Sequence, residues 1–269
     1  MKESDKTFAG SVPELYERYL GSWMFEPYAA DLARRAAALE TEYLLEIAAG
    51  TGIATRALAR ALPAHVSILA TDLNQGMLDV AARIGAAPNV EWRQADALSL
   101  PFADRTFDTA VCQFGAMFFP DKLAAYRETM RVLKPGGRFL FSVWDRIEEN
   151  EFVRSVSDAV AACFPQDPPQ FMPRIPFGYY DVSAIRAALL KAGFRECAAE
   201  TVSIRAEVPS ARIAALGLCQ GTPLRLEIEA RGATALETAT TVATAALEQQ
   251  FGTGPIAGGM QAHIFAVTR

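Results

Sequence analysis

The sequence is poor in the residues that build metal centres and redox pairs. It contains only two histidines and four cysteines in 269 residues. None of the cysteines has the C-x-x-C spacing of a zinc site or a thiol redox pair. We therefore expect no metal, and we interpret the cysteines as buried apolar thiols in a reducing compartment. They are Cys112, Cys163, Cys197 and Cys219.

Clusters of basic residues and long apolar runs are also missing. The formal net charge is −5, and phosphate contacts require clustered Lys and Arg. No apolar run approaches the length of a membrane span, and the first ten residues lack the apolar centre of a signal peptide. We therefore expect a cytoplasmic protein with no nucleic-acid partner and no membrane association. At 51% hydrophobic residues the chain can bury the core of an ordinary α/β domain.

The most informative segment is LLEIAAGTGIATRALARAL, residues 44–62. An apolar run ends in Gly50-Thr51-Gly52, and a helical Ala/Leu pattern follows at once. A buried strand, a tight glycine turn and a helix start bring main-chain N–H groups and a helix N-terminus close to a ligand. The order predicts a cofactor cradle.

Two phosphate-binding motifs fit this segment poorly. A dinucleotide fingerprint places a third glycine where this chain has Thr55, and no Lys-Ser/Thr pair completes a P-loop. Asp72 stands at the end of the next apolar run, where a carboxylate accepts hydrogen bonds from ribose hydroxyls. Asp72 is also placed to cap the following helix. If Asp72 binds hydroxyl groups in this way, the ligand carries a ribose.

Five linked blocks resemble a known family. In chain order they are EIAAGTG, TDLNQGML, QADALSLPF, FDTAVCQFGAMFF and RVLKPGGRFLFSVW. Together they are similar to class I S-adenosylmethionine-dependent methyltransferases, in the branch of the ubiquinone and menaquinone C-methyltransferases. Two departures are Ala49, where Cys or Gly is more usual, and Gln94-Ala95, where the family has Gly before Asp96. Both leave the cradle intact.

The resemblance implies a fold and a set of cofactor contacts. The fold is Rossmann-like, a seven-stranded, mostly parallel sheet with helices on both faces, an antiparallel last strand and helical lid insertions. The expected cofactor is S-adenosylmethionine. The residues expected to bind it are Tyr19, Glu46, Ala48, Gly50, Thr51, Gly52, Asp72, Leu73, Met77, Asp96, Ala97 and Gln113.

Additions flank the five blocks. We divide a single methyltransferase domain into an N-terminal helical cap, a cofactor-binding core and two lid insertions, at residues 1–39, 40–145, and 146–180 with 207–259. The cap contains two helices interrupted at Gly21 and Pro27, and the last insertion contains two helical patterns. Additions that close over the carboxyl edge of a parallel sheet favour a small, largely apolar acceptor. The alternative is that they lengthen the core or form a homodimer interface.

Methyl transfer by in-line displacement needs alignment and a dry pocket more than dedicated catalytic groups. No catalytic residue is assigned, because none of the base candidates is convincing. They are Tyr16, Tyr19, Tyr179, Tyr180 and Asp181. The fourth strand lacks the Asn/Asp-Pro-Pro turn of enzymes that methylate nucleic-acid amino groups, which favours a small-molecule acceptor. Two alternatives stay open: a non-catalytic S-adenosylmethionine-binding protein and a nicotinamide-dependent oxidoreductase.

Overall fold

The computed structural model describes residues 5, 8 and 10–269, and these form two compact units. We call them the sheet unit and the helical unit. The sheet unit consists of Glu26–Val143, Tyr180–Val202 and Ala262–Arg269. The helical unit consists of Met1–Phe25, Trp144–Tyr179 and Ser203–Gln261. Each is described below by itself, and the predicted division into cap, core and lids stays a prediction.

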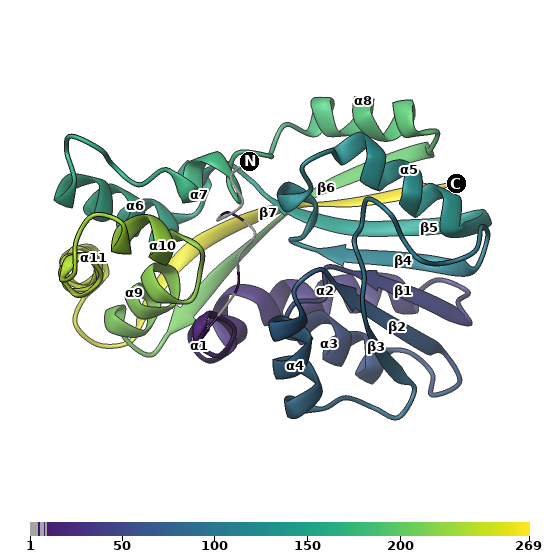
Figure 1. The fold of residues 1–269 in the computed structure, drawn as a ribbon, viewed down its shortest axis with the longest axis horizontal. Coiled ribbons are helices and arrows are strands. Elements are labelled where there is room, and N and C mark those ends of the chain that lie inside the picture. The colour runs from purple at the N-terminus through teal and green to yellow at the C-terminus, as the bar shows by residue number, and fades with distance from the viewer. Residues whose placement is uncertain (1–4, 6–7, 9) are drawn as a thin grey trace. The chain divides into compact units, whose positions relative to one another are not determined.

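A seven-stranded sheet forms the frame of the fold, in the order β3-β2-β1-β4-β5-β7-β6. The strands are β1 Tyr43–Ile47, β2 Ser67–Asp72, β3 Val90–Gln94, β4 Phe107–Gln113, β5 Leu133–Trp144, β6 Arg195–Val208 and β7 Ile256–Thr268. The first five pair in parallel, whereas β7 runs antiparallel (Figure 1). The predicted Rossmann-like, mostly parallel sheet with an antiparallel last strand is confirmed.

Apolar strands and flanking helices explain the core of the sheet unit. Leu44 and Leu45 of β1 are both fully buried, as expected for a parallel sheet that is covered on two faces. Helices lie on both faces, with α2 packed beside α3 and α5 beside α8 (Figure 1). The helices of this unit are α2 Glu26–Ala37, α3 Ile53–Ala61, α4 Gln75–Ile84, α5 Lys122–Val132 and α8 Val182–Ala192.

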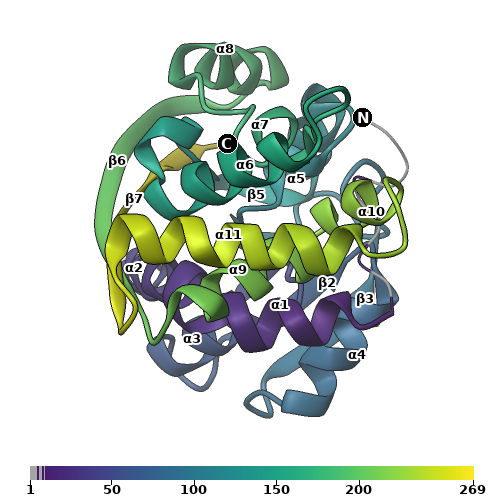
Figure 2. The same cartoon turned by 90° about the vertical axis from the view of Figure 1, so that its left-hand side faces the viewer.

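The helical unit is built around one long helix. Figure 2 shows α11 running alongside α9 and α6, and α1 running alongside α9. Its helices are α1 Val12–Leu20, α6 Glu151–Cys163, α7 Phe171–Arg174, α9 Ala211–Gln220, α10 Leu224–Glu229 and α11 Ala235–Phe251. The segment after β6 therefore holds three helices. The sequence pattern predicts only two, because the six residues of α10 are too few to show a helical period.

The expected break in the N-terminal helices takes another form. A π-helical turn at Gly21–Phe25 follows α1 directly, and α2 begins at Glu26. Pro27 is the second residue of α2, which directly follows the π-helical turn, so its missing N–H falls where the helical hydrogen-bond pattern changes. Gly21 and Pro27 thus mark a change of helix type between two helices.

Pro-Gly-Gly lies within β5 rather than before it. Along β4 the pairing advances from Phe107 to Thr109, while along β5 it advances from Leu133 to Arg138. The extra residues form an irregularity in the strand. At the other end, β4 stops at Gln113, and Ala116–Phe118 form a short 3₁₀ turn.

Candidate cofactor site

The cradle is a turn with several left-handed residues between β1 and α3. Gly50 has φ +57° and Gly52 has φ +81°, and Gly52 is the N-cap of α3. Ala48 adopts φ +57° as well, although L-residues with a side chain seldom adopt this conformation. A main-chain hydrogen bond of 2.9 Å from Ala49 N to Thr71 O fixes the turn to β2. The α3 N-terminus therefore begins at a rigidly folded loop.

The side of Gly52 is closed by protein atoms. A Cβ on Gly52 would lie 2.6 Å from the Trp92 ring and 3.2 Å from Ala81 Cβ. The positive φ and this contact both require glycine here. At Gly50 an added Cβ would meet only Met77 Cε, at an ordinary 3.5 Å.

Asp72 ties the end of β2 to the cradle. Its Oδ2 accepts a hydrogen bond of 2.8 Å from Gly50 N, and its Oδ1 accepts one of 2.7 Å from Asn74 N. Burial raises the pKa of the Asp72 carboxyl, and the donors Asn74 and Gly50 oppose that rise. Asp72 thus orients the glycine turn and the start of α4 (first turn at Gln75) together. Its predicted contact with ribose stays a prediction.

Glu46 is a buried acid on β1. Its side chain is only 1% exposed, and Oε2 has no hydrogen-bond partner among the described residues. Burial, with a smaller contribution from the charge of Asp72, raises the pKa of Glu46 to about 8, while Thr55 and Arg56 oppose the rise. An uncompensated carboxyl in this position is costly to bury. It is suited to receive a cation or a hydrogen-bond donor from a ligand.

The end of β4 closes against the cradle. Phe114 has φ +50°, and a Cβ on Gly115 would lie 2.5 Å from Ala48 Cβ and 2.7 Å from Cys112 Sγ. Gly115 therefore leaves the space that the Ala48 methyl group fills. Sequence reasoning missed this pair, and the only signal for it is a glycine two residues after Gln113.

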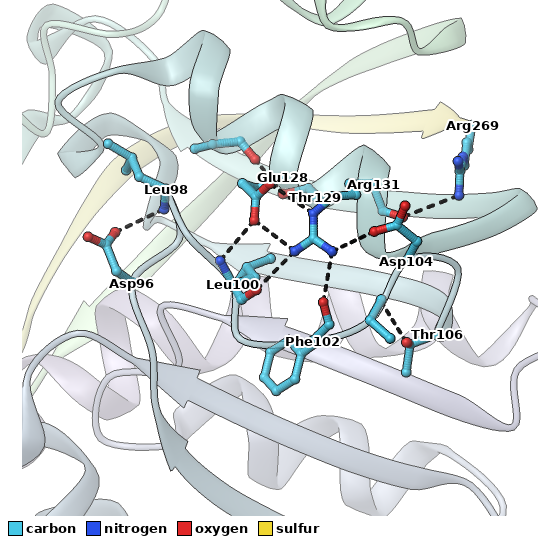
Figure 3. A network of polar contacts seen from close by, with 12 residues as sticks. Asp96, Leu98, Leu100, Phe102, Asp104, Thr106, Glu128, Thr129, Arg131 and Arg269 are labelled. Carbon is cyan, nitrogen blue, oxygen red and sulfur yellow. Dashed lines mark hydrogen bonds and ion pairs between the residues drawn. The ribbon is translucent and has the colours of Figure 1, made fainter.

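Four more of the predicted cofactor-binding residues follow the ends of β2 and β3. Leu73 is 43% exposed, whereas Met77 and Ala97 are buried. Asp96 is exposed, and its Oδ1 accepts a hydrogen bond of 2.9 Å from Leu98 N (Figure 3). The strands β2 and β3 pair up to Asp72 and Gln94, so these positions share one edge of the sheet.

Tyr19 belongs to the helical unit. Its carbonyl oxygen accepts a hydrogen bond from Trp23 Nε1, and Arg18 lies over its ring, 5.2 Å from the centroid. Its predicted contact with the cofactor stays a prediction.

The helical unit contains a cluster of aromatic rings. Tyr16 stacks on Phe25 with ring centroids 4.6 Å apart, and Trp144 stacks on Phe177 at 5.7 Å. Phe25 and Trp144 join the two pairs at 6.1 Å. We call these four rings the aromatic cluster. Phe25, Trp144 and Phe177 are each less than 7% exposed, so these rings are packed in the apolar core of the helical unit.

The described residues contain neither a group of metal ligands nor a membrane-spanning helix. Within residues 5, 8 and 10–269, no three His, Cys, Asp or Glu side chains are grouped as metal ligands. None of the helices in the same part of the chain is long and apolar enough to cross a membrane.

Comparison with known proteins finds a matching family and similar proteins for part of the chain. Residues 45–141 match the family described as methyltransferase domain. A ubiquinone/menaquinone biosynthesis C-methyltransferase from Klebsiella pneumoniae is 42% identical over 101 residues, which cover 36% of this chain and 40% of that protein. The chain thus spans about 40% of the length of the curated relatives it matches.

Solved structures show the same fold. The YcgJ protein from Bacillus subtilis has a TM-score of 0.58 at 22% identity and covers 90% of this chain and 98% of its own. A phosphoethanolamine N-methyltransferase of Haemonchus contortus, solved with S-adenosylhomocysteine, has a TM-score of 0.61 at 17% identity and covers 98% and 59%.

The seven-stranded sheet has the fold of these solved structures. Residues 45–141 match the methyltransferase domain family and are similar to the ubiquinone/menaquinone C-methyltransferases, so the resemblance that the five sequence blocks carry is confirmed over these residues. The matches support the predicted enzyme class and S-adenosylmethionine as its cofactor, and the activity of the whole chain is a proposal.

The cradle fits this cofactor. The unpartnered Glu46 Oε2 suits the ammonium group of its methionine part, and the exposed Asp96 suits an amino group that donates a hydrogen bond. Both acceptors belong to the sheet unit, Glu46 on β1 and Asp96 just after β3.

Proposed function

We propose that the chain transfers a methyl group from S-adenosylmethionine to a small, largely apolar acceptor. The observation that carries the proposal is Glu46, a fully buried carboxyl with an oxygen that no described residue satisfies, on the strand that enters the glycine cradle. A buried polar atom of this kind is retained where a ligand completes it.

The cofactor would be held by residues of three strand ends. Asp72 would accept hydrogen bonds from the ribose, Asp96 from the adenine amino group, and Glu46 from the ammonium group. The remaining members of the proposed set are Tyr19, Ala48, Gly50, Thr51, Gly52, Leu73, Met77, Ala97 and Gln113.

When bound, S-adenosylmethionine supplies an electrophilic methyl carbon. The chain then has to hold the acceptor in line and to exclude water. The aromatic cluster is our candidate for the acceptor wall, because its packed rings exclude water and have little side-chain freedom to lose. This favours a flat, apolar acceptor.

One candidate base has a structural explanation. Asp181 Oδ1 accepts hydrogen bonds from Ser183 N at 2.8 Å and Ala184 N at 3.0 Å, so Asp181 caps the N-terminus of α8. Tyr180 is 40% exposed. We therefore assign no general base and attribute the proposed rate enhancement to alignment and desolvation.

Calorimetric titration tests the cofactor and separates the alternatives. S-adenosylhomocysteine should bind with micromolar or tighter affinity, and NAD should not bind. A radiolabelled-methyl screen of small aromatic acceptors then tests transfer. Tight NAD binding would favour the oxidoreductase alternative. Cofactor binding with no transfer to any acceptor would favour the non-catalytic one.

The acceptor wall needs its own variant. Shortening residues 165–176 would also remove Phe171 and Met172, which are buried in the helical unit. Phe177→Leu is milder, because it shortens one ring of the cluster. We expect the KM for the acceptor to rise about tenfold with an unchanged affinity for S-adenosylhomocysteine. Unchanged acceptor kinetics would place the acceptor elsewhere.

A further inference from the structure

Arg131, which is not among the predicted site residues, binds the loop between β3 and β4 through its side chain. The Arg131 guanidinium donates to Leu100 O at 2.9 Å, Phe102 O at 2.7 Å and Asp104 Oδ1 at 2.8 Å (Figure 3). It also donates to both carboxylate oxygens of Glu128, at 2.9 and 2.8 Å. One side chain of α5 therefore binds three positions of the loop.

Glu128 completes this network. Its Oε2 accepts a hydrogen bond of 2.9 Å from Leu100 N, so both main-chain polar groups of Leu100 are held by the pair. Arg131 lowers the pKa of the Glu128 carboxyl, and Glu128 raises the pKa of Arg131. Both groups are charged at neutral pH, and charge-assisted hydrogen bonds in a fork are the strongest and most directional kind.

Asp96 begins the same loop, four residues before Leu100. Its carboxylate accepts from Leu98 N, and Asp96 O accepts from Ser99 N at 3.0 Å. Ala97 and Leu100 are buried, while Asp96 is exposed. The turn that carries Asp96 is therefore fixed at one end by β3 and at the other by Leu100. Because these hydrogen bonds connect Asp96 to the residues just before Leu100, we expect a shift of Leu100 to displace the Asp96 carboxylate.

We propose that the Glu128–Arg131 pair is the positioning element that makes Asp96 selective for the 6-amino group of adenine. The proposal rests on the proposed function. A carboxylate accepts a hydrogen bond from that amino group, whereas a 6-oxo purine presents a second acceptor to it. Selectivity of this kind requires that the acceptor cannot move away.

The experiment compares two ligands on one set of variants. Calorimetry measures the affinities for S-adenosylhomocysteine and for its 6-oxo analogue, S-inosylhomocysteine. In the unmodified chain we expect a preference of about tenfold or more for the adenine ligand. In Asp96→Asn the preference should vanish. In Arg131→Gln and Glu128→Gln it should fall at least about threefold, because the loop relaxes.

The control is Arg34→Gln, which removes an exposed arginine that is paired with Asp31 in the same unit. It should leave the preference unchanged. Amide hydrogen exchange gives a readout that needs no ligand: the Leu100 amide should exchange at least about tenfold faster in both Gln variants. If Arg131→Gln does not fold, Glu128→Gln decides.

The outcomes are distinct. Faster exchange together with a lost preference supports the proposal. A retained preference in both folded Gln variants, or unchanged exchange at Leu100, overturns it. If neither ligand binds the unmodified chain, the proposed function fails, and the exchange result alone shows whether the pair holds the loop.

Discussion

Two buried acids, one in each unit, are compensated differently. In the helical unit Asp5 is 1% exposed, and its two oxygens accept hydrogen bonds of 2.6 and 2.7 Å from Arg174. In the sheet unit Glu46 is equally buried, yet its Oε2 has no partner among the described residues. The first acid is neutralised within the fold and joins distant segments of the chain. The second is uncompensated, as expected of a group that awaits a ligand.

Backbone strain follows the same division. Among the described residues, the four non-glycine residues with positive φ all lie in the sheet unit, and two of them, Ala48 and Phe114, flank the cradle. A conformation of this kind costs about 1–3 kcal/mol per residue. The helical unit instead gathers stacked aromatic rings. The sheet unit thus contains the strained turns around the cradle, and the helical unit contains the buried aromatic cluster.

The largest expected effect is at the cradle. Gly52→Val introduces a branched Cβ at φ +81° and against Trp92, and we expect it to weaken S-adenosylhomocysteine binding at least about a hundredfold. Calorimetry measures the affinity, and circular dichroism checks that the sheet still folds.

Gly85→Ala is the matched control for the cradle. Gly85 also has a positive φ, but a Cβ there would meet no atom within 4 Å. Gly85→Ala should lower the free energy of unfolding and leave the affinity for S-adenosylhomocysteine unchanged. Undiminished affinity in folded Gly52→Val protein would contradict the motif assignment.

Removal of Arg174, which pairs with the buried Asp5 of the helical unit, should lower the free energy of unfolding. Arg174→Gln removes the guanidinium that forms an ion pair with the buried Asp5 carboxylate, so we expect the free energy of unfolding to fall by about 3 kcal/mol in urea titrations. The Asp5→Asn, Arg174→Gln double variant should recover part of the loss. Arg146→Gln, which breaks an exposed pair with Glu149, should cost under about 1 kcal/mol. Equal losses for the two arginines would show that the burial of Asp5 does not strengthen its ion pair with Arg174.

The uncompensated acid should make stability fall as pH rises. The folded-state pKa of Glu46, about 8, lies above the ordinary value of 4.5. Between these two pH values the folded state therefore keeps a proton that the unfolded state has released. The contribution of Glu46 to the free energy of unfolding is full below pH 4.5 and is lost as the pH rises through 8. The loss approaches about 2 kcal/mol between pH 5 and pH 7.

Glu46→Gln should remove this pH dependence. The test is the difference between the two proteins in urea titrations at several pH values, which cancels the contributions of all other groups. Parallel curves would show that Glu46 is ionised in the folded protein.

The smallest expected effect is at Asp72. Asp72→Ala removes the acceptor for Gly50 N and the proposed ribose contacts, so binding of S-adenosylhomocysteine should weaken at least about tenfold. Asp79→Ala, on α4, is the control. An unchanged affinity would leave Asp72 with the purely structural role of fixing the turn.

Much of the sheet unit was predictable because its signals are local. A strand, a glycine turn and a helix start occupy consecutive residues from Leu44 to Leu62, and each block of the family motif is similarly continuous. The short helix α10 and the irregular β5 were not predictable, since neither produces a period long enough to read. Three of the four connected rings, Phe25, Trp144 and Phe177, lie far apart in the chain and reveal nothing of their contact in the sequence.

The sequence by itself determined the class of fold, the cradle and the acids that end its strands, because these depend on which residue types follow one another. Only the tertiary structure decided how each acid is used. It pairs Asp5 with an arginine 169 residues away, leaves Glu46 unsatisfied, and holds Leu100 with a side chain from α5. Charge compensation and close packing depend on distances in space, and chain order does not carry those distances.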